Sequence, residues 1–151
     1  MGKETLYARI NSCKLEIELN QTAILKLERK IELYEYIQGK VERGADNLRD
    51  FCNYQNEKIH ITQSSYPKVK FVDGYAEDMT GYLQGQEFNQ TMNEFLSASN
   101  KLSNKREMAI EQVNSLRRAI SRLEEEIVLL DAQIREMERQ EAEARVAQFY
   151  W

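Results

Sequence analysis

Two long stretches of the chain carry apolar residues at alternating spacings of three and four positions, and this pattern constrains the fold more than any other feature. The spacing places these side chains on one narrow stripe of an α-helix, and such a stripe packs against a second helix. We call the two stripes the first and the second seam. The first seam comprises Leu6, Ile10, Cys13, Ile17, Asn20, Ile24, Leu27, Ile31, Tyr34, Gln38, Val41, Ala45, Leu48, Cys52, Gln55 and Ile59. The second seam comprises Phe88, Met92, Phe95, Ser99, Leu102, Arg106, Ala109, Val113, Leu116, Ile120, Leu123, Ile127, Leu130, Ile134, Met137, Glu141 and Ala144.

The two seams are complementary when the chain folds back on itself. Matching Ile59 with Phe88 places Ile17 opposite Leu130, and it sets β-branched positions of one seam against leucine positions of the other. A register shifted by one heptad is also compatible with the pattern. The seams therefore predict two antiparallel helices.

The predicted fold is all-α, a long antiparallel two-helix coiled-coil hairpin that forms a single domain over residues 1–151. We expect the helices at about residues 3–61 and 87–145. An extended, partly structured connection at about residues 62–86 joins them at the tip. A hairpin of this kind buries a stripe rather than a globular core, which agrees with the 30% content of charged residues.

Polar residues interrupt the first seam at Asn20 and Gln38. A polar residue in one layer often fixes the register at a cost in stability, and a tolerated defect is the alternative interpretation. The matched register places Gln38 opposite Ala109. Cys13 and Cys52 also lie on the seam, about 58 Å apart on one helix at about 1.5 Å per residue, which is too far for a disulfide bond between them.

The connection is far longer than is usual between paired helices, and it holds the only proline, Pro67. The alternation in Lys68–Val72, followed by the turn pair Asp73-Gly74, is compatible with a short strand. Tyr75–Met79 is compatible with a helical turn. Four aromatic residues and one leucine form either a cap over the end of the seam, near Ile59 and Phe88, or a recognition surface at the tip: Tyr66, Phe71, Tyr75, Tyr82 and Leu83.

The first helix carries more apolar residues than its seam requires, and the second helix adds two more. An apolar strip on the outside of a hairpin, near its open end, suggests a helix contributed by another chain. Self-association of two hairpins into a four-helix bundle and scattered surface leucines are the alternatives. The candidate partner-binding residues are Leu15, Leu19, Leu25, Leu33, Ile37, Val128 and Leu129.

The second helix is expected to fray past Glu141, where the charges alternate. The stretch Phe149–Trp151 then brings three aromatic residues together. They either fold back on Leu6 and Ile10 or insert into a partner.

Composition and motifs argue against several classes of function. The chain has 21 basic and 25 acidic residues and no basic run, which disfavours nucleic acid as the main partner. The only histidine, His60, has no metal-ligand neighbours at helical spacing, and no catalytic set or phosphate-binding glycine loop is present. We therefore expect no enzyme activity, no cofactor and no metal. Since neither a long apolar span nor an apolar leader is visible, we also expect neither membrane insertion nor a Sec signal peptide.

Residues 82–85 read Tyr-Leu-Gln-Gly just before the second helix, which continues with Phe88 and Phe95. On these residues and on its helical layout, the chain resembles the small helical-hairpin proteins of bacterial type VII secretion. These include the WXG-like secreted proteins and the small partners encoded beside LXG toxins. Such proteins place Trp-x-Gly, or Leu-x-Gly in the toxins, in the turn between two antiparallel helices. Leu83 and Gly85 are the matching positions.

The resemblance implies a non-enzymatic adaptor or targeting partner that bundles laterally with the helical N-terminal domain of an LXG toxin, together with a second small helical protein. It implies a cytoplasmic protein of a Gram-positive bacterium. The usual export tag, Tyr-x-x-x-Asp/Glu near the C-terminus, is missing, so type VII export would depend on a partner that carries it. Two alternatives are a structural coiled-coil spacer and a prefoldin-like chaperone subunit, which sets a coiled coil around a β-containing connection.

Overall fold

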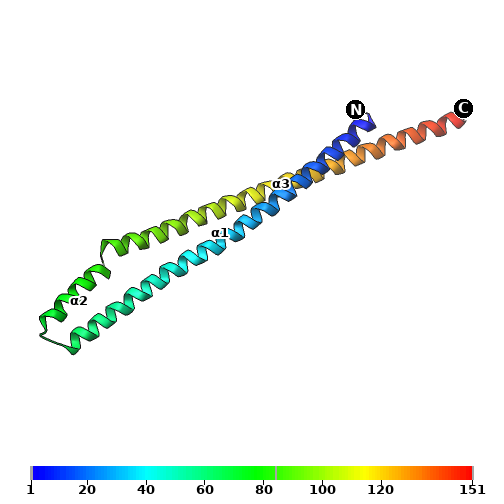
Figure 1. The fold of residues 1–151 in the computed structure, drawn as a ribbon. Helices are drawn as coiled ribbons and strands as arrows, with labels where there is room; N and C mark the ends of the chain where they lie inside the picture. Colours follow the sequence, from blue (N-terminus) through cyan, green and yellow to red (C-terminus); the bar gives the residue numbers. More distant parts are fainter. Residues whose placement is uncertain (1, 84, 151) are drawn as a thin grey trace. The chain divides into compact units, whose positions relative to one another are not determined.

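The computed structural model of the protein describes residues 2–83 and 85–150 and is an all-α helical hairpin (Figure 1). Helix α1 spans Lys3–Ser65, α2 spans Lys70–Leu83 and α3 spans Gln86–Tyr150. No β-strand occurs among the described residues.

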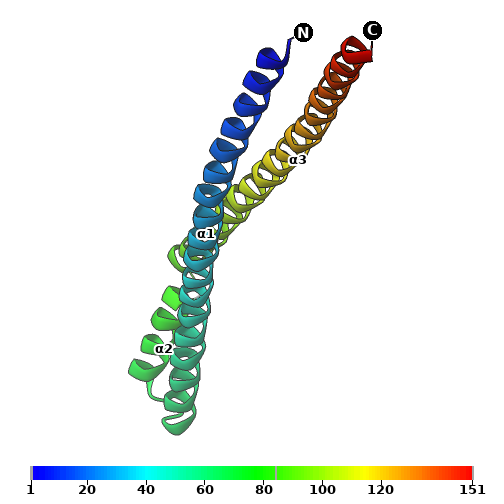
Figure 2. The same cartoon turned by 90° about the vertical axis from the view of Figure 1, so that its right-hand side faces the viewer.

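Contacts between the helices divide the chain into two units. Unit 1 consists of Met1–Lys30 and Met108–Trp151, so the first part of α1 lies antiparallel to the second part of α3. Unit 2 consists of Ile31–Glu107, so the remainder of α1 lies against α2 and the first part of α3. Figures 1 and 2 both show α2 beside the last turns of α1.

Both seams are confirmed as the faces along which α1 and α3 pack. Every residue of the first seam is buried or half-buried, and so is every residue of the second seam as far as Met137. Glu141 and Ala144, at the end of the second seam, are exposed. The expected fraying past Glu141 is wrong, because α3 remains helical as far as Tyr150.

The register of unit 1 differs by one heptad from the matched register. Leu130 packs in a buried cluster with Leu6, Ile10 and Ile134. The sequence match predicts Ile17 opposite Leu130, but Ile10, seven residues earlier, takes that place. The structure thus has the shifted register that the pattern also allows.

Two ion pairs between the helices flank the seam of unit 1 in this shifted register. Arg9 donates to both carboxylate oxygens of Glu126, at 2.7 and 2.9 Å. Arg117 donates to Glu28 at 3.0 Å. These residues directly precede or follow seam positions on their helices. The pair of Arg9 and Glu126 favours the same alignment as the apolar cluster, whereas the pair of Arg117 and Glu28 does not separate the two registers.

The connection contains the helix α2, Lys70–Leu83, instead of an extended strap. The predicted strand at Lys68–Val72 is therefore wrong, because those residues are helical from Lys70 onwards. The expected helical turn at Tyr75–Met79 is confirmed as part of α2.

A tight turn separates α1 from α2. α1 ends at Ser65, because the residue before Pro67 is disfavoured in helical conformation. Lys68 has a positive φ of 75°, which reverses the chain direction. The Asp73 amide then donates to the carbonyl of Val69 at 3.1 Å, which closes the first turn of α2.

Helix α2 covers the end of the first seam in unit 2. Ala76 and Leu83 form a buried cluster with Cys52 and Ile59, and the partly buried residues packed against this cluster are Leu48, Met79 and Phe88. Matching Ile59 directly with Phe88 ignores this intervening helix. Because α2 takes up the last turns of the first seam, α3 joins that seam one heptad earlier.

A polar layer lies within unit 2. The Gln38 amide donates to the Ser99 hydroxyl at 3.3 Å, and that hydroxyl donates to Glu42 at 3.3 Å. The prediction that Gln38 lies opposite Ala109 is wrong by the same heptad shift. The half-buried Gln38 gains a hydrogen-bond partner in this register, which supports its interpretation as a residue that fixes the alignment.

The aromatic residues at the end of α3 lie in solvent. The side chains of Phe149 and Tyr150 are 92% and 86% exposed, so neither packs on Leu6 or Ile10. Trp151 lies outside the described residues. The alternative, insertion into a partner, stays a prediction for Phe149 and Tyr150.

Candidate interaction surfaces

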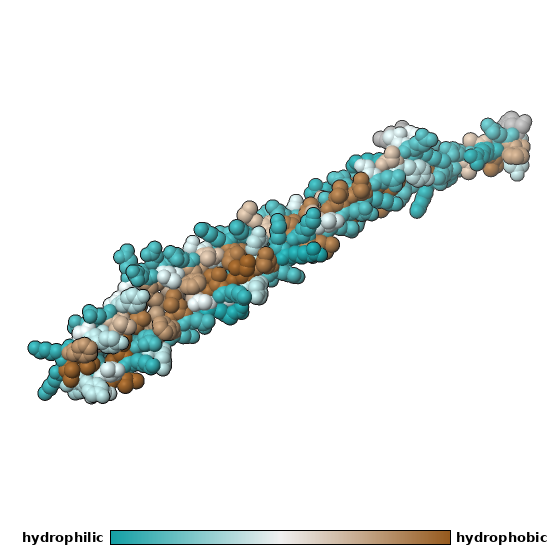
Figure 3. All heavy atoms as spheres, viewed as in Figure 1, coloured by the Kyte–Doolittle hydropathy of each residue, from teal (hydrophilic) through white to brown (hydrophobic). Residues whose placement is uncertain are grey.

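The partner-binding residues predicted in unit 1 are all exposed. The side chains of Leu15, Leu19, Leu25, Val128 and Leu129 are between 57% and 67% exposed. The seam beside them is already filled, and these side chains lie outside it. Figure 3 shows hydrophobic residues at the surface among hydrophilic ones.

The shifted register changes which of these residues lie level with each other. The matched register predicts Val128 level with Leu19, whereas the observed register brings Val128 level with Ser12. Leu15 is therefore closer to Val128 along the helix pair than Leu19 is.

Unit 2 contains the other two predicted partner-binding residues. Leu33 is 53% exposed and Ile37 is 37% exposed, and they lie one turn apart on α1. Sequence reasoning did not select Phe51 and Tyr54 of the same helix, which are also more than half exposed. Phe51 and Tyr54 lie off the seam and three positions apart, and this pattern in the sequence indicates an exposed apolar pair.

Leu83 and Gly85 form the junction between α2 and α3. Leu83 is 6% exposed and belongs to the apolar cluster under α2. A Cβ atom on Gly85 would lie 2.5 Å from the carbonyl oxygen of Gly81, so only glycine fits this position. The Gly85 carbonyl accepts a hydrogen bond from the Asn89 amide at 3.2 Å and so begins α3. This motif therefore has a structural role.

The four aromatic residues of the tip are exposed rather than packed over the seam. The exposed fractions are 59% for Tyr66, 82% for Phe71, 50% for Tyr75 and 66% for Tyr82. The cap interpretation is confirmed for Leu83, which packs with Ile59, but it is wrong for the four aromatic residues, because Ala76 and Met79 of α2 complete the cap instead. The use of the four aromatic residues as a recognition surface stays a prediction.

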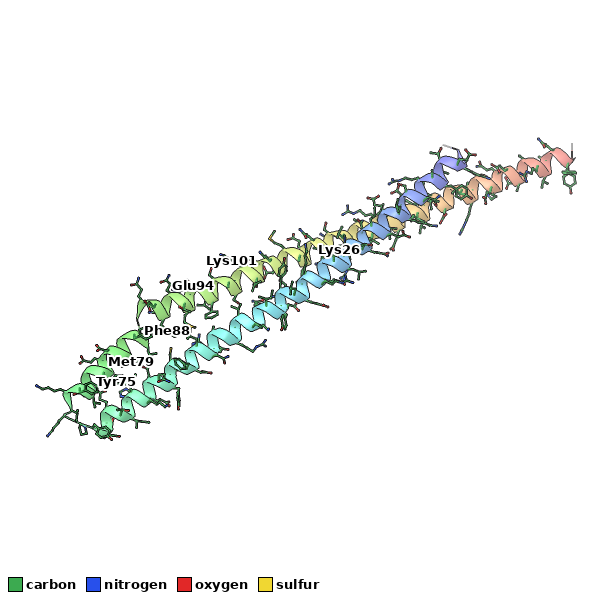
Figure 4. The ribbon with its side chains drawn as sticks, in the orientation of Figure 1. Lys26, Tyr75, Met79, Phe88, Glu94 and Lys101 are labelled. Carbon is green, nitrogen blue, oxygen red and sulfur yellow. The ribbon has the colours of Figure 1, made fainter. Side chains whose placement is uncertain are left out.

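A shallow groove lies where α1 meets the junction of α2 and α3. Its volume is ≈ 240 Å³, and it is lined by Leu48, Phe51, Cys52, Tyr82, Leu83, Glu87, Phe88 and Thr91. Figure 4 labels Phe88 at the start of α3, and Tyr75 and Met79 on α2. The groove is mainly apolar and carries one carboxylate.

Burial and hydrogen bonding shift the pKa values of two thiols and one carboxyl group. Burial raises the pKa of the Cys13 and Cys52 thiols above the ordinary value of 9.0, so both stay protonated near neutral pH. The hydrogen bonds from Arg9 lower the pKa of the Glu126 carboxyl. Both cysteines are free in the structure.

Among residues 2–83 and 85–150, no group of three or more His, Cys, Asp and Glu side chains is arranged to hold a metal ion. In the same part of the chain, none of the helices is sufficiently long and apolar to cross a membrane. The only histidine, His60, is exposed on α1.

No family model matches the chain, and comparisons with curated proteins and with solved structures likewise give no match.

Proposed function

We propose that this chain is a non-enzymatic adaptor that bundles with the helical N-terminal domain of a type VII-secreted LXG toxin. The proposal rests on the resemblance of the Leu-x-Gly junction and the helical layout to the small partners of such toxins. The observation that carries it is the set of exposed apolar side chains beside the filled seam of unit 1. In this proposal the chain resides in the cytoplasm and leaves the cell only together with its toxin.

The exposed side chains are suited to a helical partner. Leu15 and Leu19 are one turn apart on α1, and Leu129 is an exposed apolar side chain on α3 of the same unit. An amphipathic helix recognises such a surface through anchors spaced by three or four positions. Fully burying one leucine contributes roughly 1.5–3 kcal/mol, so a few of these side chains suffice for specific binding.

The test is binding between this chain and the N-terminal domain of an LXG toxin from the same genome. We expect Leu19→Asp and Val128→Asp to abolish the complex, measured by calorimetry, because each places a charge in the apolar contact. Asn100→Asp is the matched control, since Asn100 is exposed on α3 in unit 2, is not one of the candidate partner-binding residues and gains the same charge. Far-UV circular dichroism verifies that all three variants stay helical.

Binding that survives both aspartate substitutions would overturn this proposal. A loss of binding in the Asn100→Asp variant as well would show that added charge alone, rather than the loss of apolar contact, determines the effect. The prefoldin-like alternative depends on a strand in the connection, and the helix found there removes its support.

A further inference from the structure

One exposed face of α2 is aromatic, and no other helix of the described residues 2–83 and 85–150 covers it. Phe71, Tyr75, Asp78 and Tyr82 recur at spacings of four, three and four, so they share one helical face, which flanks the face that packs on α1. All four are exposed, Phe71 by 82%. A 14-residue helix that places three aromatic rings in water has the composition of a contact surface.

Two glycines lie next to this aromatic face of α2. A Cβ atom on Gly74 or on Gly81 would meet nothing within 4 Å. Glycine inside a helix costs about 1 kcal/mol relative to alanine, and packing within the chain does not require it at these positions. An open notch of this kind permits a second helix to approach the backbone closely.

The groove described above lies at the other end of α2 from Phe71. Its volume of ≈ 240 Å³ exceeds the roughly 150 Å³ of an apolar cavity that binds benzene. It is therefore large enough for one aromatic ring. Leu83 and Phe88 line its apolar wall, and Tyr82 stands at its edge.

We propose that two copies of this chain associate through antiparallel α2 helices, with Phe71 of each copy inserted in the groove of the other. Phe71 and Leu83 are twelve positions apart on α2, about 18 Å at about 1.5 Å per residue. A two-fold axis through the middle of α2 satisfies both insertions at once, as a self-complementary interface requires. The same pairing brings Tyr75 of one copy level with Asp78 of the other.

Charge complementarity identifies a second copy as the occupant. Lys68 and Lys70 precede Phe71, and both are exposed. Glu87 lines the groove that receives the ring. The two-fold axis forms this lysine–glutamate contact twice, and complementary charges of this kind fix the register of an interface.

Sedimentation velocity over a hundredfold range of concentration tests the proposal. We expect the wild-type chain to dimerise and Phe71→Glu to raise the dissociation constant about 100-fold or more, because two buried rings are replaced by charges. Phe149→Glu is the matched control: it makes the same change at a phenylalanine that is 92% exposed in unit 1, and we expect it to dimerise like wild type. Phe71 is itself exposed, so neither variant alters packing within the chain.

A charge reversal gives an independent readout. Lys70→Glu should weaken the dimer, and the double variant Lys70→Glu with Glu87→Lys should restore it. A wild-type chain that stays monomeric, a Phe71→Glu variant that still dimerises, or a double variant that is no stronger than Lys70→Glu would each overturn the proposal. The surface is separate from the unit 1 leucines, so the Leu19→Asp variant should dimerise normally whatever its effect on toxin binding.

Discussion

Gly85 offers the sharpest test of how the junction between α2 and α3 is built. Substitution by alanine would place a methyl group 2.5 Å from the carbonyl oxygen of Gly81. That oxygen belongs to the backbone of α2, so it cannot rotate away as a flexible side chain would. The last turn of α2 must therefore move away from the start of α3.

The magnitude of the effect follows from what this movement exposes. Leu83 is 6% exposed and packs against Cys52 and Ile59. Fully exposing a leucine costs roughly 1.5–3 kcal/mol. We therefore expect Gly85→Ala to lower the free energy of unfolding by about 2 kcal/mol, although alanine is the better helix former.

Gly39→Ala is the matched control, because a Cβ atom on Gly39 would meet only the Arg43 guanidinium, at 3.8 Å. Gly39 lies inside α1, so this variant should gain about 1 kcal/mol from helix propensity. Urea unfolding followed by circular dichroism at 222 nm compares the two variants, and hydrogen exchange localises the change to α2. The steric argument is refuted if Gly85→Ala is as stable as wild type, or if it gains stability as Gly39→Ala does.

Two further predictions concern groups inside the seam. Gln38→Leu should raise the free energy of unfolding by about 1 kcal/mol but loosen the register, because polar seam residues specify alignment at a cost in stability. Spin labels at residues 40 and 101 would detect a slip of one heptad, about 10 Å, and a single unchanged distance would contradict the prediction. Burial raises the pKa of the Cys13 and Cys52 thiols above 9.0 in the folded chain. As the pH rises, the thiols of the unfolded chain therefore ionise before those of the folded chain. The contribution of the buried thiols to the free energy of unfolding is thus constant below pH 9.0 and falls above it. The double variant Cys13→Ala with Cys52→Ala should lose less stability between pH 8 and pH 10 than wild type does, measured by urea unfolding at each pH, and equal losses would contradict this.

The helices could be predicted from the sequence because their packing depends on local periodicity. Each seam residue from Leu6 to Ile59 and from Phe88 to Met137 is at least half-buried, since a spacing of three and four fixes one face of a helix whatever lies opposite. The exposure of the outer leucines follows from the same geometry. What binds them is not a local property of the chain and stays a proposal.

The register and the connection could not be predicted in the same way. A heptad pattern looks the same after a shift of seven residues, so apolar matching alone does not separate Ile10 from Ile17 as the neighbour of Leu130. The flanking pair of Arg9 and Glu126 distinguishes the two registers, and the sequence match did not include it. The sequence indicates a strand where α2 begins, because the alternation in Lys68–Val72 is the stronger local pattern there. The burial of Ala76 on α1 is a tertiary contact that this short segment does not reveal by itself.

The helix α2 also has a consequence for the order in which the chain folds. The hydrogen bond between Gln63 and Asp73 links residues only ten positions apart, whereas the one between Lys3 and Glu141 links residues 138 positions apart. Contacts that close short loops form fastest, because little chain entropy is lost before they are made. We therefore expect α2 and the neighbouring turns to form the folding nucleus. The termini should then pair last in folding and separate first in unfolding.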